Sequence, residues 1–307
     1  MGGAAVAEEV RASYAPVPLY GLAGREPLRF PVFLRTSATT WVLYKDVATA
    51  VNEEHLGRLQ AEGCHELYIR ESDRPAYYQR IEGELDGILK DKNSPLERRA
   101  DVLHGVALAA AEDLLGKRPD AERIARTKKV MIATSGLLLR EQQGFQAVRR
   151  VLGASKGLVT HSLTVSFLAM GLARHVLSAE ANVLLLAGMA GMLHDVGKVG
   201  YEQLDHDPEH AQRGAQILAS LGVPGPVIDA AAAHHERHDG SGFPHGLRGA
   251  QIPEMARLVG LVDAFDKVYS TQQPRVGVFD ALRILAQAYR GCFDERLALG
   301  FVKLFKA

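Results

Sequence analysis

The chain has 307 residues, of which 47% are hydrophobic and 23% charged, as in an ordinary globular protein, so long disordered regions are not expected. Its 36 basic and 36 acidic residues cancel, which argues against binding of DNA or a membrane surface through overall charge. Two cysteines are too few for a disulfide framework or a cysteine zinc site, and neither a signal peptide nor a membrane span is predicted, so the expected location is the cytoplasm.

The first part of the chain is predicted to be a flexible segment, residues 1–15, followed by a small α/β domain over residues 16–92. Three short segments are rich in β-branched or aromatic residues and are bounded by turn residues, which predicts strands. These strands are Leu28–Leu34, Thr40–Tyr44 and Leu67–Arg70. Asn52–Glu62 has helical spacing. No phosphate-binding loop or phosphorylation pocket is evident here, so no ligand is predicted for this domain.

Residues 93–307 have helical periodicity throughout and predict an all-α domain. Ser94 with Glu97 three residues later fits a capping box at the start of the first helix. The predicted helices are Ala100–Leu115, Ala121–Leu139, Leu158–Leu177 and Ala181–Leu193. The expected fold class is therefore α+β, with a small α/β domain followed by a helical bundle.

Histidine is concentrated in this second domain, since nine of the twelve histidines lie between His161 and His245. His194 and Asp195 end an apolar helix, where a buried carboxylate needs a partner such as a metal ion. The candidate ligands are His161, His194, Asp195, His210, His234, His235 and Asp263. Five imidazoles and two carboxylates are more protein ligands than one metal ion normally binds. Two divalent ions bridged by a carboxylate fit this number. This donor set favours iron or manganese, with zinc, cobalt or nickel as alternatives.

Two motifs carry a family resemblance. The segment 194–198, HDVGK, resembles the H-D-x-G-K core of HD-domain phosphohydrolases, and the segment 234–244, HHERHDGSGFP, closely resembles the H-H-E-x-x-D-G-x-G-Y-P signature of the HD-GYP subgroup. Ile252-Pro253 and the segment 262–266 resemble downstream elements of that subgroup. The resemblance covers about residues 95–307 and implies an HD-type helical bundle with a dinuclear metal site.

The resemblance also implies an activity, the hydrolysis of a 3′–5′ phosphodiester in a cyclic dinucleotide by a metal-bridging hydroxide. The implied substrate is cyclic di-GMP or mixed 3′,3′-cyclic GMP-AMP. One metal is assigned to His161, His194, Asp195 and Asp263, and the other to His210, His234, His235 and the bridging Asp195. His210 is preferred to His206 because the segment 210–214 matches the family's H-P-x-x-G apart from Ala211. Asp195 and Lys198 are the implied catalytic residues, with Lys198 placing positive charge at the phosphoryl oxygens.

The chain departs from the family pattern at three positions. Gly157 stands where some members carry a glutamate that recruits a third metal, which favours two metals here. Phe243 replaces the signature tyrosine, so the ring is kept and its hydroxyl lost. Gln272 replaces the first arginine of the family's R-P-Y-R or R-P-Y-K element. Glutamine pairs with adenine as arginine pairs with guanine, so Gln272 or Gln273 is a candidate reader of adenine, the alternative being a loop without base contact.

The substrate-binding residues predicted in this way are Lys198, Arg237, Phe243, Gln272, Gln273 and Arg275. For Arg237 the alternative is an ion pair with an acidic neighbour. Asp239 is predicted to orient a ligand histidine, with a plain turn residue as the alternative.

Two other functions compete with this hypothesis. The first is a degenerate module that binds nucleotide or a protein partner without turnover, and the second is a hydrolase of nucleoside phosphates. The candidate protein partners are a GGDEF-type or other signalling protein and a second copy of this chain. The N-terminal domain resembles the short regulatory domains fused before such catalytic domains.

Overall fold

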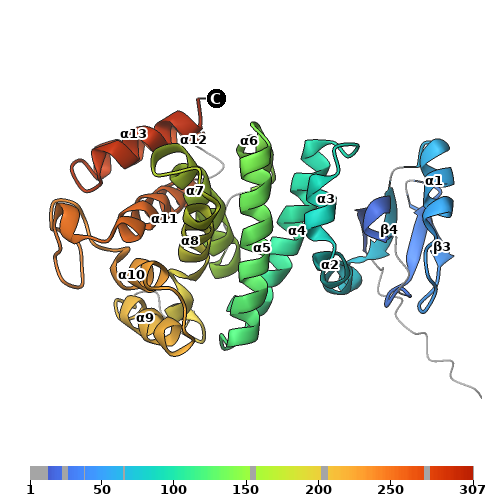
Figure 1. Cartoon of the computed structure of the whole chain (residues 1–307), viewed down its shortest axis with the longest axis horizontal. Coiled ribbons are helices and arrows are strands. Elements are labelled where there is room, and N and C mark those ends of the chain that lie inside the picture. Colours follow the sequence, from blue (N-terminus) through green and yellow to red (C-terminus); the bar gives the residue numbers. More distant parts are fainter. Residues whose placement is uncertain are drawn as a thin grey trace, which may run out of the picture. The chain divides into compact units, whose positions relative to one another are not determined.

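The computed structural model describes residues 13–22, 27–37, 39–64, 66–152, 157–201, 207–272 and 277–306. The chain divides into two compact units, Met1–Ile88 and Leu89–Ala307, whereas the sequence analysis placed the boundary after residue 92. The first unit carries the strands and the second is built of helices (Figure 1). The expected α+β class, with a small sheet domain before a helical bundle, is confirmed.

The first unit is built on a four-stranded antiparallel sheet in the order β1-β4-β2-β3. Its strands are β1 (Tyr14–Pro18), β2 (Val32–Arg35), β3 (Trp41–Lys45) and β4 (Glu66–Arg70). Its helices are α1 (Glu53–Ala61) and α2 (Arg74–Glu82), and α3 (Leu85–Lys90) spans the boundary with the second unit. The core of the unit holds the fully buried side chains of Phe30, Ile69 and Tyr77.

Strand β1 was not expected from the sequence. It begins at Tyr14, inside the segment predicted to be flexible, and Tyr14 pairs with Arg70 of β4. Pro16 and Pro18 lack the backbone N–H that a central strand needs, which disguises the strand in the sequence. The sheet order explains why the prolines are tolerated. Strand β1 lies at the edge of the sheet, so the backbone on one side of it needs no hydrogen-bond partner.

The second unit is a helical bundle. Its longer elements are α4 (Leu96–Leu115), α5 (Ala121–Arg140), α6 (Gly144–Val151), α7 (Leu158–Val176), α8 (Ala181–Leu193), α9 (His210–Ser220), α10 (Gly225–Ala233), α11 (Glu254–Gln272), α12 (Val278–Ala288) and α13 (Glu295–Leu304), with short 3₁₀ turns at Val196–Lys198 and Gly249–Gln251. The capping box predicted at the start of α4 is wrong. Pro95 occupies the N-cap position, so Ser94 lies one residue too early, and its buried hydroxyl has no hydrogen-bond partner in the part of the chain that the structure describes.

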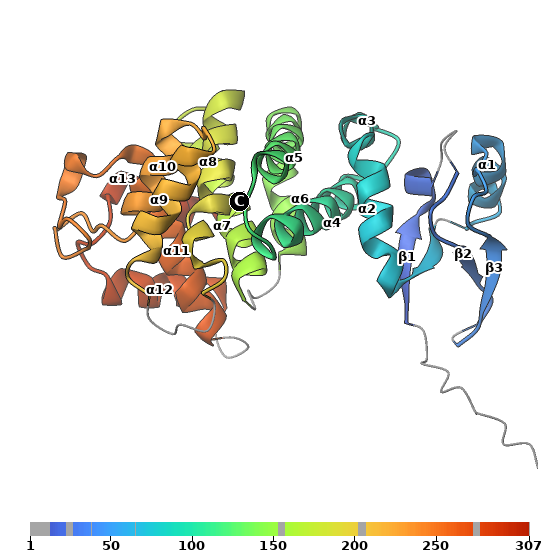
Figure 2. The ribbon, with the colours of Figure 1, turned by 90° about the horizontal axis from the view of Figure 1, so that it is seen from below.

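Helices α7 and α8 form the centre of this unit, and α10 and α11 pack beside them (Figures 1 and 2). The two central helices approach closely, because a Cβ placed on Gly191 of α8 would lie 2.6 Å from the Ser166 backbone of α7. This packing places the start of α7 beside the end of α8. Among the described residues, no helix is both long and apolar enough to cross a membrane.

Candidate metal centre

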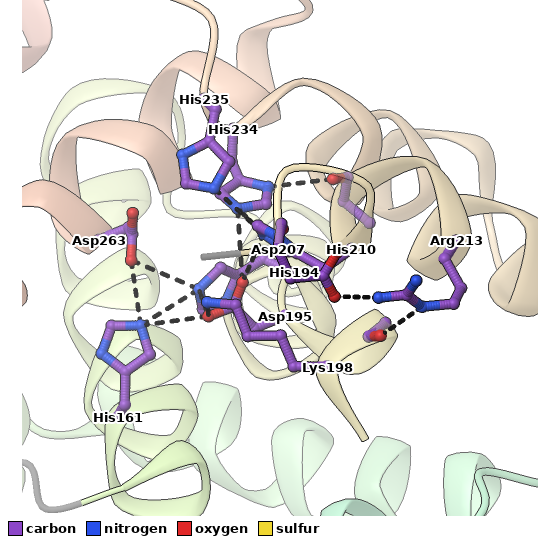
Figure 3. Close-up of polar contacts among 12 residues, drawn as sticks. His161, His194, Asp195, Lys198, Asp207, His210, Arg213, His234, His235 and Asp263 are labelled. Carbon is purple, nitrogen blue, oxygen red and sulfur yellow. Dashed lines mark hydrogen bonds and ion pairs between the residues drawn. The ribbon is translucent and has the colours of Figure 1, made fainter. Parts of the chain in front are cut away.

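Three helices bring the first group of candidate ligands together. His161 lies in the first turn of α7, His194 and Asp195 directly follow α8, and Asp263 lies on α11. His161 Nε2 is 3.0 Å from Asp263 Oδ1 and 3.3 Å from His194 Nε2. The side chains of His194, Asp195 and Asp263 are at most 1% exposed. This part of the prediction lies in one buried cluster (Figure 3).

The second group forms on the other side of Asp195. His210 is the first residue of α9, and His234 and His235 follow α10. His210 Nε2 is 3.1 Å from Asp195 Oδ1 and 3.1 Å from His235 Nε2, and His234 Nε2 is 3.5 Å from Asp195 Oδ1. The structure therefore gathers all seven predicted ligands in two groups that share Asp195 (Figure 3).

Hydrogen bonds fix which nitrogen of each ring faces the cluster. Nδ1 of His194 contacts Gly191 O at 2.8 Å, Nδ1 of His234 contacts Ala231 O at 3.0 Å, and Nδ1 of His210 contacts Asp207 O. A carbonyl oxygen can only accept, so each Nδ1 carries the hydrogen and donates it. The lone pair of each neutral ring is then on Nε2, which points into the cluster.

The cluster is a poor arrangement for a protein core and a good one for a cation. Nε2 of His210 and Nε2 of His234 face one another at 3.4 Å, although neutral rings with Nδ1–H offer only lone pairs there. Asp195 Oδ1 and Asp263 Oδ1 are buried and have no hydrogen-bond partner among the described residues. Buried polar atoms in native proteins are normally satisfied. The residues present therefore fit divalent metal ions, which bind imidazole nitrogen and carboxylate oxygen together.

The electrostatics of the two groups differ. Burial disfavours a charged His161, but the neighbouring carboxylates of Asp263 and Asp266 outweigh it and raise the pKa of His161 to about 9. Burial lowers the pKa of His234 to about 4, and burial together with neighbouring charges lowers the pKa of His235. Burial also opposes ionisation of Asp195, yet His194 and its neighbours hold the pKa of this carboxyl well below its usual range. At neutral pH His234 and His235 therefore offer free imidazole lone pairs beside the ionised carboxylate of Asp195.

Close backbone contacts position His210. A Cβ on Gly197, in the 3₁₀ turn after Asp195, would lie 2.0 Å from His210 O, so only glycine lets this turn approach α9. Arg213 Nε donates to Gly197 O at 2.8 Å, and the same guanidinium pairs with Asp207, whose carbonyl accepts from His210. Arg213 thus connects the turn that carries Asp195 with the loop that orients His210.

Asp266 was not predicted as a site residue. Its Oδ2 lies 2.7 Å from Nδ1 of His161, so it orients this imidazole as the backbone carbonyls orient the other rings. The sequence carries a signal for it. Asp266 follows Asp263 by three residues in an apolar helix, so both carboxylates face the same side.

Replacement of Asp266 by asparagine is expected to weaken metal binding at the group that contains His161 by about 10–100-fold, because the ring loses its charged partner. Manganese titration of the metal-free protein measures this change. Asp280→Asn, at an exposed position on α12, is the matched control and should leave the affinity unchanged. Equal affinities for the wild type and Asp266→Asn would contradict the orienting role.

The loop after His235 is held by a buried carboxylate that the sequence analysis missed. Glu236 accepts from the backbone N–H groups of His245 at 2.7 Å and Leu247 at 2.9 Å. This closes the loop and places Phe243 beside the cluster. The Phe243 ring is 42% exposed and stacks on His235, with ring centroids 4.6 Å apart. An exposed aromatic face therefore adjoins a candidate ligand.

Two residues of the same loop make contacts other than those predicted. Asp239 accepts from Ser241 at 2.7 Å and contacts Cys292, so the prediction that it orients a ligand histidine is corrected to a turn role. Arg237 donates to the carbonyls of His234 and Glu236, each at 3.0 Å, and lies against aromatic rings. Its predicted phosphate contact stays a prediction.

Lys198 adjoins the cluster as predicted by the resemblance. Its Nζ lies 2.6 Å from Asp195 Oδ2, and its side chain is 29% exposed (Figure 3). Gln272 ends α11, but its side chain lies outside the described residues, as do Gln273, Arg275 and His206.

Comparisons with known proteins agree with this arrangement. Residues 158–268 match the family model described as HD domain. A protein of Pseudomonas aeruginosa named cyclic di-GMP phosphodiesterase is 32% identical over 185 residues, which is 55% of this chain and 44% of the relative. A 3′3′-cGAMP-specific phosphodiesterase of Vibrio cholerae is 32% identical over 127 residues, which is 37% of this chain and 27% of the relative.

A solved structure extends the comparison to the fold. A protein of Bdellovibrio bacteriovorus, described as an HDG"Y"P protein, aligns over 96% of this chain and 100% of its own with a TM-score of 0.68 at 20% identity. At this identity the match shows a shared fold. The chain spans less than half of the length of the Pseudomonas relative and about a quarter of the Vibrio relative.

The helical bundle, the buried histidine–aspartate cluster and the matched family model define an HD-domain protein with a site able to bind metal. Within that class the second motif, at residues 234–244, indicates the subgroup. Residues 158–268 match the HD domain, and the second motif resembles that of HD-GYP proteins, with phenylalanine in place of the signature tyrosine.

Proposed function

We propose that the protein hydrolyses a 3′–5′ phosphodiester of a cyclic dinucleotide, cyclic di-GMP or 3′,3′-cyclic GMP-AMP. The observation that carries the proposal is the pair of ligand groups that share Asp195, because two ions close together can bind both oxygens of an in-line displacement at phosphorus. The names of the Pseudomonas and Vibrio relatives support the substrate class.

Two divalent ions would be held, one by His161, His194, Asp195 and Asp263 and the other by Asp195, His210, His234 and His235. Mixed nitrogen and oxygen ligands favour iron or manganese. When bound, such a pair supplies an acidified water and positive charge for the phosphoryl oxygens. Gly157, at the start of α7, offers no side chain for a further ion, which supports two.

The chain's own residues add binding and orientation. Lys198 Nζ donates to Asp195 Oδ2, its hydrogen-bond acceptor among the described residues, and an ammonium group has further N–H donors for a phosphoryl oxygen at the cluster. The exposed Phe243 ring, held on His235, provides a face on which a base stacks. Loss of the tyrosine hydroxyl removes a hydrogen-bonding group and leaves this stacking intact.

Gln272 is proposed to shift base preference towards adenine. Gln272→Arg is expected to lower the ratio of kcat/KM for cyclic GMP-AMP over cyclic di-GMP about tenfold, since one bidentate base contact is worth 1–3 kcal/mol of discrimination. Steady-state kinetics with both dinucleotides measure the ratio. Gln287→Arg, exposed on α12, adds the same charge elsewhere and should leave it unchanged. An unaltered ratio in Gln272→Arg would refute the base contact.

The alternative is a module that binds the nucleotide without turnover, and the replacements at Phe243 and Gln272 favour it. Turnover of both cyclic dinucleotides by anaerobically purified, manganese-loaded protein separates the two. Hydrolysis that disappears on chelation and returns with metal is expected. Tight nucleotide binding with two ions bound and no product would establish the alternative. A GGDEF-type partner, a homodimer and a regulatory role of the first unit remain predictions.

A further inference from the structure

Each of the two buried carboxylates in the cluster is paired with one lysine. Lys198 Nζ lies 2.6 Å from Asp195 Oδ2, three residues away, and Lys267 Nζ lies 2.8 Å from Asp263 Oδ2, four residues away on α11. Oδ1 of Asp263 faces His161, and Oδ1 of Asp195 faces His210, while Oδ2 of Asp195 also lies 3.4 Å from His194 Nε2. Lys267 therefore occupies a position towards Asp263 that mirrors the position of Lys198 towards Asp195.

Lys267 reaches from the cluster to solvent. Its side chain is 43% exposed, although that of Asp263 is 1% exposed. Its charge acts on Asp263 and Asp195 and also on His235, so it lies beside both ligand groups. An ammonium group has three N–H donors, and within the described parts of the chain Asp263 is the acceptor of the hydrogen bond found for Lys267.

Metal binding alone does not explain a lysine at this position. A fixed positive charge beside a carboxylate repels a cation bound to the same carboxylate, and the effect is strong where water is largely excluded. The interaction with an anion is favourable instead, because both the metal ions and the ammonium group attract it. The benefit of Lys267 is thus expected when an anion is bound.

We propose that Lys267 is a second phosphate-binding cation of the centre, which together with Lys198 holds the phosphoryl oxygens from the side of Asp263. The proposal rests on the proposed function and extends it to a residue of α11 outside both sequence motifs. Lys267 binds substrate directly and keeps one proton on Asp263 Oδ2, so the phosphate is held from two sides of the metal centre.

The test uses the manganese-loaded full chain, with inorganic phosphate as the probe and isothermal titration calorimetry as the readout. Lys267→Met is expected to raise the Kd for phosphate about tenfold, the loss of one charge-assisted contact. The same variant should retain two manganese ions per chain and bind them as tightly as the wild type or more tightly. Lys267→Arg should restore phosphate binding to within about threefold. Lys128→Met, exposed on α5, is the control.

A Kd that rises less than about threefold in Lys267→Met overturns the proposal. Loss of manganese from this variant overturns it as well, since Lys267 would then serve only to hold Asp263. Phosphate binding requires no turnover. Wild-type protein that binds phosphate through Lys267 and hydrolyses neither cyclic dinucleotide would contradict the proposed function and leave this inference standing.

Discussion

Replacement of Asp195 by asparagine is expected to lower cyclic dinucleotide turnover by at least about 1000-fold, roughly 4 kcal/mol of transition-state stabilisation. Asp195 is the one residue that both ligand groups contain, and its side chain is 1% exposed. An amide offers one neutral acceptor oxygen where the carboxylate offers two charged ones, so neither ion keeps its shared ligand. Metal content is expected to fall from two ions per chain to below one.

Two measurements make this result specific. Asp229→Asn, at an exposed position on α10, should retain both the metal and the turnover. Circular dichroism should show that Asp195→Asn keeps the helical bundle. A folded Asp195→Asn protein that still hydrolyses the substrate at a tenth of the wild-type rate or more would refute a bridging role.

Removal of metal is the second large effect, and it acts on stability. The metal-free cluster buries the facing lone pairs of His210 and His234, together with two carboxylate oxygens that have no hydrogen-bond partner among the described residues, and bound ions relieve this condition. Two ions, each present at about 100 times its Kd, stabilise the folded state by about 5 kcal/mol. For a unit of this size that corresponds to a fall in Tm of about 10–20 °C on chelation.

Thermal unfolding followed by circular dichroism, with and without chelator and under anaerobic conditions, measures the shift. Addition of manganese should restore the original Tm. Chelator should have little effect on Asp195→Asn, which lacks the shared ligand. A wild-type Tm that stays within about 2 °C on chelation would show that the cluster does not hold ions under these conditions.

The ligand residues could be predicted from the sequence because metal chemistry restricts residue types strongly. Burying polar side chains without a partner is unfavourable, so their presence in an apolar context indicates a bound cation. This applies to His194 and Asp195 at the end of an apolar helix, and to His234 and His235 after an alanine-rich run. The helix that precedes His194 was also predictable from length and periodicity. Strand β1 was not, since its prolines are tolerated only at a sheet edge and edge position is a property of the whole sheet.

The residues that orient the site were mostly missed, for a related reason. Asp266 acts through a long-range contact with His161, and Glu236 acts through two contacts within its own loop. The spacing of Asp266 from Asp263 in an apolar helix is a sequence signal, but it does not identify His161 as the partner. For Asp239 the error was the opposite one, because the sequence analysis assigned it an orienting role and the structure shows a turn contact. Asp239 lies in the signature motif, but its carboxylate accepts a hydrogen bond from Ser241 within the turn. Motif position therefore predicted the candidate ligands better than their supports.

Metal stoichiometry tests the central claim most directly. Anaerobically purified wild type, His161→Ala and His235→Ala are loaded with manganese and analysed for metal and protein. Two ions per chain are expected in the wild type and one in each variant, since each histidine belongs to one of the two groups that share Asp195. A wild type that holds a single ion at full turnover, or variants that keep both, would contradict the account.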